Sequence, residues 1–363
     1  MRPTRIVLLK YLDRIIGKLA AGLFLPTRNS SNVPPDIKQV LFIRPGGIGD
    51  AVLLIEAIRA LKQVYPNAVV NVLAEKRNSS VFSLSPDVGR IWHYDKPVEL
   101  FAAIRSNYDV VIDTEQWHRL SAIVAKMTHT PLSVGFATNE RGKFFTHAVA
   151  YFHDDYEADS FIHLVEPLIG NISIDFGEPF LVVPADVTRK VRDLLKVIAT
   201  RRIVAIFPGG SIPERKWGSS KFHLMARALE KRGFATVIIG DVNDREAGSE
   251  IASGGENVID LCGYLSLVET AAVLKESVLL ITGDSGILHI GFGLGVKTLS
   301  LFGPGIEKKW APRGPAHVVI NKHLPCSPCT KFGYTPKCKM NAECMKRISV
   351  EEVLEKALAI LEG

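Results

Sequence analysis

The sequence predicts an α/β fold built from two successive doubly wound halves, each around a parallel sheet. Short apolar runs rich in β-branched residues alternate with helix-like segments along most of the chain. Continuous runs of this kind are typical of parallel strands covered on both faces, and strands alternating with helices indicate right-handed crossovers. Glycine-rich turns follow several of the runs, and the pattern starts again near residue 192.

Length and composition are those of a globular protein with room for two ordinary domains. The chain has 363 residues, of which 47% are hydrophobic. Its net charge of +6 suits an anionic substrate, an anionic membrane surface or nucleic acid, and charge alone does not choose among them. No aromatic-and-basic repeat, zinc-finger spacing or ribonucleoprotein motif is present, so we expect no nucleic-acid partner.

Residues 1–35 form a first segment that precedes the predicted domains. Charged residues at positions 10, 13, 14 and 18 interrupt its apolar stretch, which is therefore too broken to span a bilayer. No small-residue cleavage site follows a clean apolar core, so we do not expect a signal peptide. Leucine and isoleucine share one face of a helix over residues 1–26, with basic residues opposite. This amphipathic helix suits either an anionic membrane surface or the protein's own body, and the polar stretch Thr27–Pro35 then acts as a linker.

The first predicted domain, residues 36–178, begins with a strand, a turn and a helix. The strand is Val40–Ile43 and the helix Ala51–Leu61. Gly46 and Gly47 in the turn let a ligand approach the backbone closely. Asp50 is placed at or near the helix N-cap, at the carboxyl end of a first strand, where open α/β sheets place their chemistry. A plain capping role for this aspartate remains open.

The remaining elements of the first half follow from the same patterns. We expect strands at 68–74, 88–94, 109–113 and 132–136, and helices at 100–106, 121–127 and 161–169. Thr138–Asp159 lacks clear periodicity, which predicts a loop region facing a cleft between the domains. Gly170–Val183 is the expected crossing between them.

The second predicted domain covers residues 179–348, followed by a C-terminal helix in 349–363. Strands are expected at 202–207, 235–240, 258–261, 277–282 and 297–302, and helices at 221–232, 244–252, 266–275, 287–294 and 349–361. Ser349 with Glu352 three residues on predicts a capping box for the last helix. A ligand cleft between two doubly wound halves is the natural inference.

Four turn motifs together resemble one family. They are Arg44-Pro-Gly-Gly-Ile-Gly-Asp50, Pro208-Gly-Gly-Ser211 with Lys216-Trp217, Asp284-Ser-Gly-Ile-Leu-His289, and Leu301-Phe-Gly-Pro304. In this order they resemble the heptosyltransferases, the family 9 glycosyltransferases of lipopolysaccharide assembly. The resemblance covers the chain from about residue 39 to the C-terminal helix. It implies two Rossmann-like domains in the arrangement called GT-B, with a nucleotide-sugar on the C-terminal domain and the acceptor on the N-terminal one.

The resemblance also implies roles for individual residues. Asp50 matches the family's catalytic base, and Lys216 matches its phosphate-binding lysine, which would offset charge on the leaving diphosphate. Glu246 matches an acidic residue that holds the nucleotide ribose. The remaining donor contacts would come from two turns: Gly209, Gly210, Ser211, Asp284, Ser285 and Gly286. Ordinary interpretations stand beside these: a surface lysine, a surface glutamate and helix-capping turns. We expect His289 to be a packed residue.

The chemistry agrees with this interpretation, because inversion at an anomeric centre needs a base and stabilisation of the departing diphosphate. The turn Pro45-Gly46-Gly47 departs from the family, which often has hydroxyl residues there. That leaves backbone amides of Gly46 and Gly47 as acceptor contacts. Arg44 would bind an acidic acceptor group or pair with Asp50.

Four of the five cysteines cluster in a Cys-rich loop over residues 326–344. Cys326 and Cys329 have the tight spacing of structural zinc sites, and Cys338 and Cys344 are spaced more widely. A structural zinc on the four thiolates and two disulfides are both open, although a cytosolic location disfavours disulfides. Cys262 is expected in the core.

We therefore expect an inverting glycosyltransferase that needs no metal for catalysis. It would move a sugar from a nucleotide-sugar, most readily explained as ADP-heptose, to a lipid-linked saccharide acceptor. We expect it at the inner face of the cytoplasmic membrane, in peripheral contact with it. A nucleotide-sugar epimerase or hydrolase and a non-catalytic nucleotide-sugar binder are the alternatives. An NAD-dependent dehydrogenase fits less well, because Gly46-Gly-Ile-Gly49 lacks the G-x-G-x-x-G spacing.

Overall fold

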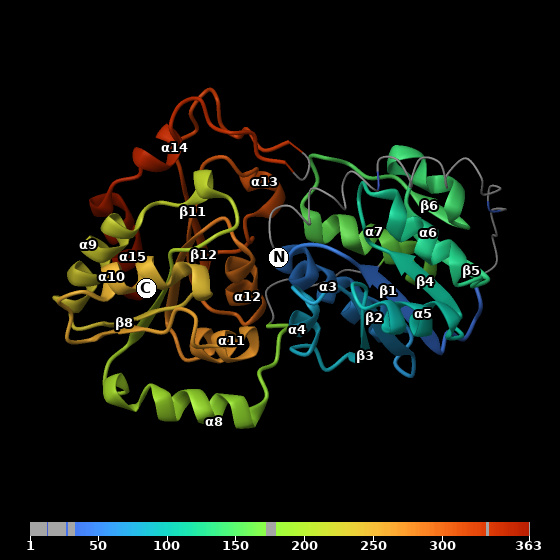
Figure 1. Cartoon of the computed structure of the whole chain (residues 1–363), viewed down its shortest axis with the longest axis horizontal. Coiled ribbons are helices and arrows are strands. Elements are labelled where there is room, and N and C mark those ends of the chain that lie inside the picture. Colours follow the sequence, from blue (N-terminus) through green and yellow to red (C-terminus); the bar gives the residue numbers. More distant parts are fainter. Residues whose placement is uncertain (1–12, 14–26, 28–32, 172–178, 332–333, 363) are drawn as a thin grey trace. The chain divides into compact units, whose positions relative to one another are not determined.

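The computed structural model describes Asp13, Thr27 and residues 33–171, 179–331 and 334–362. The chain divides into two compact units, residues 1–174 and 175–363. Figure 1 labels their elements. The predicted N-terminal amphipathic helix lies outside the described residues except for Asp13, as does the middle of the predicted crossing at 170–183.

The first unit is built around a six-stranded sheet in the order β3-β2-β1-β4-β5-β6 (Figure 1). Its strands are β1 Gln39–Arg44, β2 Val69–Ala74, β3 Val88–His93, β4 Val110–Asp113, β5 Leu132–Phe136 and β6 His147–Val149. All neighbouring strands are parallel. The strand order reverses between β1 and β4, and such a switch point is where doubly wound sheets hold ligands.

Helices connect these strands and bury the sheet. They are α3 Ile48–Val64, α4 Ser79–Phe82, α5 Pro97–Arg105, α6 Arg119–Met127 and α7 Glu157–Ile169, with a 3₁₀ helix η2 Thr138–Phe144. Val40–Ile43 is fully buried, as expected for a central parallel strand.

The prediction of an irregular loop over residues 138–159 was largely wrong. The segment holds η2, strand β6 and the first turn of α7. Its apolar pattern is weak because β6 has only three residues. In addition, Arg141 is buried in an ion pair, and hydrophobic periodicity does not reveal a buried charged residue.

The second unit repeats this topology with the order β12-β11-β10-β7-β8-β9. Its strands are β7 Ile203–Phe207, β8 Ala235–Ile238, β9 Val258–Asp260, β10 Leu279–Gly283, β11 Thr298–Phe302 and β12 His317–Asn321. Here the switch point lies between β7 and β10, and all pairings are parallel. The two parallel sheets confirm the predicted class of two doubly wound α/β halves.

The helices of the second unit are both long and short. The longer ones are α8 Ala185–Leu194, α9 Ser219–Glu230, α10 Arg245–Ala252, α11 Leu267–Lys275, α12 Gly286–Gly293 and α15 Val350–Glu362. The shorter ones are η3 Lys196–Ile198, η4 Pro213–Arg215, η5 Val242–Asp244, α13 Glu307–Trp310 and α14 Glu343–Lys346. The sequence patterns missed α8 and β12.

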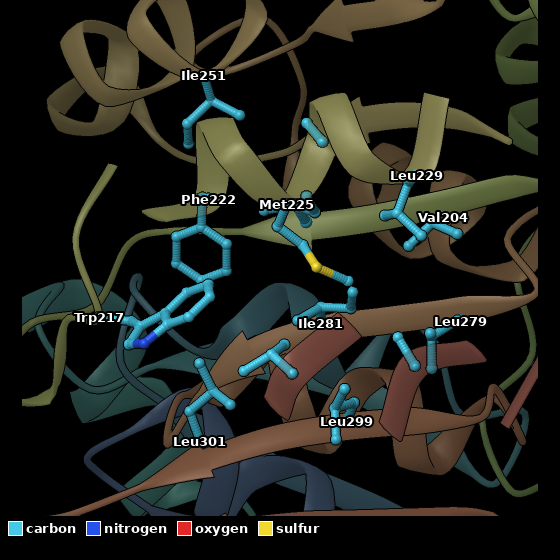
Figure 2. Close-up of a cluster of buried hydrophobic side chains, with 14 of the residues drawn as sticks. Val204, Trp217, Phe222, Met225, Leu229, Ile251, Leu279, Ile281, Leu299 and Leu301 are labelled. Atoms are coloured by element: carbon cyan, nitrogen blue, oxygen red, sulfur yellow. The ribbon is translucent and has the colours of Figure 1, made fainter. Parts of the chain in front are cut away.

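The core of the second unit fixes the end of the turn that follows β7. Figure 2 shows Trp217 against Phe222, with their ring centroids 4.9 Å apart and nearly perpendicular. Trp217 is buried, and its indole Nε1 donates a hydrogen bond to the Ile348 carbonyl at 2.9 Å. Segment 208–216 is therefore anchored at both ends, by β7 and by this tryptophan.

The Ser349 half of the predicted capping box of α15 is formed. The Ser349 hydroxyl accepts from the Glu352 amide at 3.2 Å. None of the described helices has both the length and the apolar composition needed to cross a bilayer.

Candidate functional sites

The first site lies at the carboxyl edge of the first sheet, beside the β1–β4 switch point. Arg44 ends β1 and is 2% exposed. Its guanidinium donates to the Thr114 carbonyl at 2.8 Å and pairs with Asp50 at 3.3 Å. Glu115 lies 4.0 Å from the same guanidinium. The buried arginine thus contacts two carboxylates, and the predicted pairing with Asp50 is formed.

Asp50 lies in the first turn of α3, not at its N-cap. Gly47 occupies the cap position with an extended backbone and makes no side-chain cap, so the helix begins at Ile48. A carboxylate in the first turn still faces the helix dipole favourably. The Asp50 side chain keeps 29% of its surface exposed.

Gly46 is required by the arginine beneath it. Its φ of +130° lies in the region that favours glycine, and a Cβ there would meet the Arg44 guanidinium at 2.7 Å. At Gly47 the nearest atom to a Cβ would be an Asp50 carboxylate oxygen at 3.9 Å. The predicted acceptor-binding residues Arg44, Gly46 and Gly47 are therefore brought together with Asp50.

Behind this group lies a fully buried ion pair that the sequence did not reveal. Arg141 and Asp113 are both 0% exposed, and their charged atoms are 2.7 Å apart. Burial raises the pKa of Asp113, and Arg141 opposes that shift. Burial would also raise the pKa of Glu115, but the charges of Arg44, His118 and Arg141 hold it below its usual range.

The second site lies at the carboxyl edge of the second sheet, where β7 and β10 are neighbours. One part of it joins Gly209, Lys216 and Asp244. The Lys216 ammonium lies 3.7 Å from Asp244, and a Cβ on Gly209 would collide with the same carboxylate. Lys216 is 39% exposed, whereas burial raises the pKa of Asp244. Asp244 is a residue that the motifs did not single out.

The other part joins Arg215 and Asp284. Their charged atoms are 2.7 Å apart, and both side chains are largely buried. Burial raises the pKa of Asp284, and the arginine opposes that shift. A Cβ on Gly305 would collide with the Asp284 carboxylate, so the turn after β11 closes tightly over it. Asp284 therefore belongs to an ion pair, and Arg215, not its neighbour Lys216, faces it.

Ser285 takes the capping role considered for the 284–286 turn. Its hydroxyl accepts from the Leu288 amide at 3.3 Å, at the start of α12, and Gly286 is the first residue of that helix. Gly210 has a φ of +146°, and a Cβ added to it would meet open space. Ser211 is exposed beside it.

Two other residues of the sequence motifs lie apart from these groups. Glu246 is exposed in the first turn of α10 and makes no hydrogen bond or ion pair within the part of the chain that the structure describes. His289 is 3% exposed, and burial lowers its pKa to about 4. It is packed inside α12, as expected from its position.

The cysteine segment is tied to Arg215. The Arg215 guanidinium donates to the hydroxyls of Thr330 at 3.3 Å and Thr335 at 3.4 Å. Cys262 is buried as expected, and all five cysteines are free thiols. Across the described residues, no three His, Cys, Asp or Glu side chains are grouped closely enough to hold a metal ion. As arranged here the four loop cysteines do not form a zinc site, and zinc stays a prediction of the sequence.

The residues that the motifs missed are Arg215, Asp244, Glu115 and Arg141. Arg215 and Asp244 stand beside glycine-rich turns, so their position after a strand was a usable signal. Glu115 follows the strand that ends in Asp113, and the same signal applies there. No signal in the sequence marked Arg141, because its partner Asp113 lies far away in the sequence.

Two doubly wound units with charged groups at their switch points define a ligand-binding α/β protein of the Rossmann-like type. Residues 98–339 match the family model of glycosyltransferase family 9 (heptosyltransferase). The match covers most of the chain, which therefore belongs to this glycosyltransferase family and is an enzyme that transfers sugars.

Individual relatives agree with the family match. The chain is 26% identical over 285 residues to lipopolysaccharide heptosyltransferase 3 of Escherichia coli K12, a match that spans 73% of this chain and 82% of that protein. It is 23% identical over 309 residues to lipooligosaccharide heptosyltransferase 2 of Haemophilus influenzae, over 78% of this chain and 88% of that protein.

Solved structures share the fold. The E. coli ADP-heptose lipopolysaccharide heptosyltransferase II has a TM-score of 0.74 at 20% identity, covering 89% of this chain and 98% of that one. A family 9 glycosyltransferase from Veillonella parvula has a TM-score of 0.76 at 19% identity, covering 92% and 100%. The predicted two-domain α/β fold and glycosyltransferase class are thus confirmed.

Proposed function

We propose that the enzyme transfers heptose from ADP-heptose to a saccharide of the lipopolysaccharide core, with inversion and with Asp50 as general base. The observation that carries the proposal is the position of Asp50 at the switch point of the first unit, where its side chain is partly exposed and its carboxylate pairs with the buried Arg44. The names of the relatives support the donor and acceptor classes, since they include lipopolysaccharide heptosyltransferases and a heptosyltransferase solved with ADP.

In the proposed reaction the Asp50 carboxylate takes the proton of the acceptor hydroxyl. The hydroxyl oxygen attacks the anomeric carbon, and the bond from that carbon to the diphosphate oxygen breaks, with the electron pair leaving on ADP. Arg44 keeps the carboxylate in one orientation, which reduces the entropy lost when the acceptor binds.

The second unit supplies the groups that a nucleotide-sugar needs. Arg215 and Lys216 offset the negative charge that builds up on the departing diphosphate, and backbone amides of Gly209, Gly210 and Ser211 add donors. The carboxylates of Asp244 and Asp284 accept hydrogen bonds from sugar hydroxyls. Ser285 and Gly286 shape the turn that presents Asp284. Glu246 remains a proposed ribose contact.

We place the enzyme in the cytoplasm, at the inner face of the cytoplasmic membrane, because its acceptor would be lipid-linked. The net charge of +6 suits peripheral contact with anionic lipid.

No metal is required by this chemistry. A structural zinc on Cys326, Cys329, Cys338 and Cys344 is tested by metal analysis of the purified protein, where less than one zinc per chain would reject it.

The test compares Asp50→Ala with the matched control Asp36→Ala, an aspartate exposed on the surface of the same unit. Asp50→Ala is expected to lower turnover by about 10²- to 10⁴-fold, the usual contribution of a general base, and to leave ADP-heptose binding intact in calorimetry. Asp36→Ala should match the wild type in both. Turnover that survives Asp50→Ala, or the failure of every nucleotide-sugar to bind, would reject the proposal.

A further inference from the structure

Trp117 is the exposed tryptophan of this chain. It lies just after β4, at the carboxyl edge of the first sheet, and is 44% exposed. Trp92 and Trp217 are buried at 6% and 5%, and Trp310 is half-buried. The carboxyl edge of the sheet is where doubly wound folds hold ligands, and an aromatic surface exposed there is available to pack against one.

The backbone that carries Trp117 is held rigidly. The Asn139 side-chain amide donates to the Trp117 carbonyl at 2.8 Å, and the Trp117 amide donates to the Glu115 carboxylate at 3.0 Å. Thr138 donates to the carbonyl of Gln116. The exposed ring therefore stands on a loop whose polar groups are already bonded, which is how a preorganised binding surface is built.

The Glu115 carboxylate links the Trp117 backbone to Asp50, the candidate base. Glu115 accepts from the Trp117 amide and lies 4.0 Å from the Arg44 guanidinium, which in turn pairs with Asp50 at 3.3 Å. The backbone of Trp117 and the carboxylate of Asp50 are thus linked by one chain of contacts through Glu115 and Arg44.

The charges around Trp117 favour an uncharged, hydroxyl-rich ligand group over a phosphate. Arg44 and Arg141 are buried in ion pairs with carboxylates, and Arg119 lies 3.5 Å from Glu140. The Asp50 side chain is 29% exposed. Carboxylates repel phosphate but accept hydrogen bonds from sugar hydroxyls, and the C–H face of a sugar ring packs well on an indole.

We propose that Trp117 binds the acceptor sugar by stacking on its ring face, and that Glu115 is the positioning residue that sets this platform relative to Asp50. This inference rests on the proposed function, because it names the residue that recognises the acceptor of that reaction. It assigns acceptor specificity to a side chain in the loop after β4.

The test measures steady-state kinetics of the full-length enzyme with ADP-heptose and a deacylated, heptose-terminated core oligosaccharide. Trp117→Ala should raise the KM for the oligosaccharide about tenfold or more, as loss of a central aromatic contact does, and leave the KM for ADP-heptose unchanged. Trp117→Phe keeps an aromatic ring, and its KM for the oligosaccharide should lie between those of the wild type and Trp117→Ala. Phe101→Ala removes another exposed aromatic, 56% exposed on α5, and should behave as wild type.

Glu115 is tested by Glu115→Gln, which keeps the shape but loses the charge that faces Arg44. It should raise the KM for the oligosaccharide and lower kcat together, and Glu115→Asp should restore part of both. A purely structural role would instead lower thermal stability and leave both kinetic constants of the folded enzyme unchanged.

The inference is overturned if Trp117→Ala changes the oligosaccharide KM less than twofold, or if its main effect is a lower melting temperature. A fall in binding to anionic vesicles with an unchanged KM would assign the ring to the membrane instead. If the wild type shows no turnover, the proposed function fails separately, and quenching of Trp117 fluorescence by the oligosaccharide, compared with Trp117→Phe, still decides whether the ring binds sugar.

Discussion

Arg215 and Lys216 are adjacent in sequence but lie in different surroundings. The Arg215 guanidinium is buried against Asp284, at 2.7 Å, and reaches the hydroxyls of Thr330 and Thr335. The Lys216 ammonium is 39% exposed and stands 3.7 Å from Asp244. The two cations face different carboxylates and differ in burial, so the free energy of unfolding lost on removing each should differ.

Arg215→Gln is expected to lower the free energy of unfolding by about 3 kcal/mol, because it leaves the buried Asp284 carboxylate without its counter-charge. Lys216→Gln should cost less than about 1 kcal/mol, as for other exposed pairs. Urea unfolding of both variants measures the difference. Equal losses of unfolding free energy in the two variants would show that the buried Asp284 carboxylate is not stabilised by Arg215.

At the level of single residues, the sequence motifs located the turns but not every side chain that forms an ion pair in them. The glycine-rich motifs placed Gly209 and Asp284 just after strands, and the structure has them there, whereas Lys216 follows the η4 turn. The motifs could not tell Arg215 from Lys216, because which of two adjacent side chains is buried depends on how the η4 turn rotates the backbone.

At the level of elements, helix α6 receives its N-terminal cap from a distant segment. The Asp13 carboxylate accepts from the Leu120 amide at 2.9 Å and lies 3.4 Å from the His118 ring nitrogen. Thr27 also contacts the first unit, since its amide donates to the Lys143 carbonyl at 2.8 Å and its hydroxyl accepts from Lys126. Two points of the N-terminal segment are thus attached to the first unit, one near each end of α6.

Asp13→Ala is expected to lower the free energy of unfolding by about 1 kcal/mol, the usual cost of losing a helix cap. Faster amide hydrogen exchange in the first turn of α6 should accompany the loss. Asp36→Ala is the control, because Asp36 pairs with Lys38 only at the surface. Identical exchange in the wild type and Asp13→Ala would mean that this contact does not hold α6.

Strands and long helices were predictable because each is encoded locally. The buried β1, β4, β7 and β10 are continuous apolar runs, and α7 and α15 carry a helical period. The misses were β6 and β12 at sheet edges, where burial is incomplete, and α8, whose surface is mostly polar. β6 has only three residues and β12 is mostly half-buried, so neither carries the continuous apolar run that marks the central strands.

At the level of the whole molecule, the buried His289 and the half-buried His317 are expected to make the second unit sensitive to acid. Burial lowers the pKa of both His289 and His317 from 6.5 to about 4. Below pH 6.5 the unfolded chain therefore binds protons that the folded unit does not. Stability is fully present above pH 6.5 and falls as the pH drops towards 4.

His289→Gln should remove part of this dependence. For the fully buried His289 the loss between pH 6.5 and 4 is about 3 kcal/mol at most, from the size of its pKa shift. Calorimetric melting at pH 7 and pH 5 should show a larger drop in melting temperature for the wild type than for the variant. The same drop in both would place the acid sensitivity elsewhere.

The sequence by itself determined the fold class, the two repeated halves and the glycine-rich turns that follow the strands. These depend on apolar runs, glycines and their order, which are local features of the chain. The tertiary structure decided which charged side chains meet: Arg44 with Asp50 and Glu115, Arg141 with Asp113, and Arg215 with Asp284. Most of these partners lie far apart in sequence and on different elements, so their pairing depends on sheet order and burial, which no local pattern encodes.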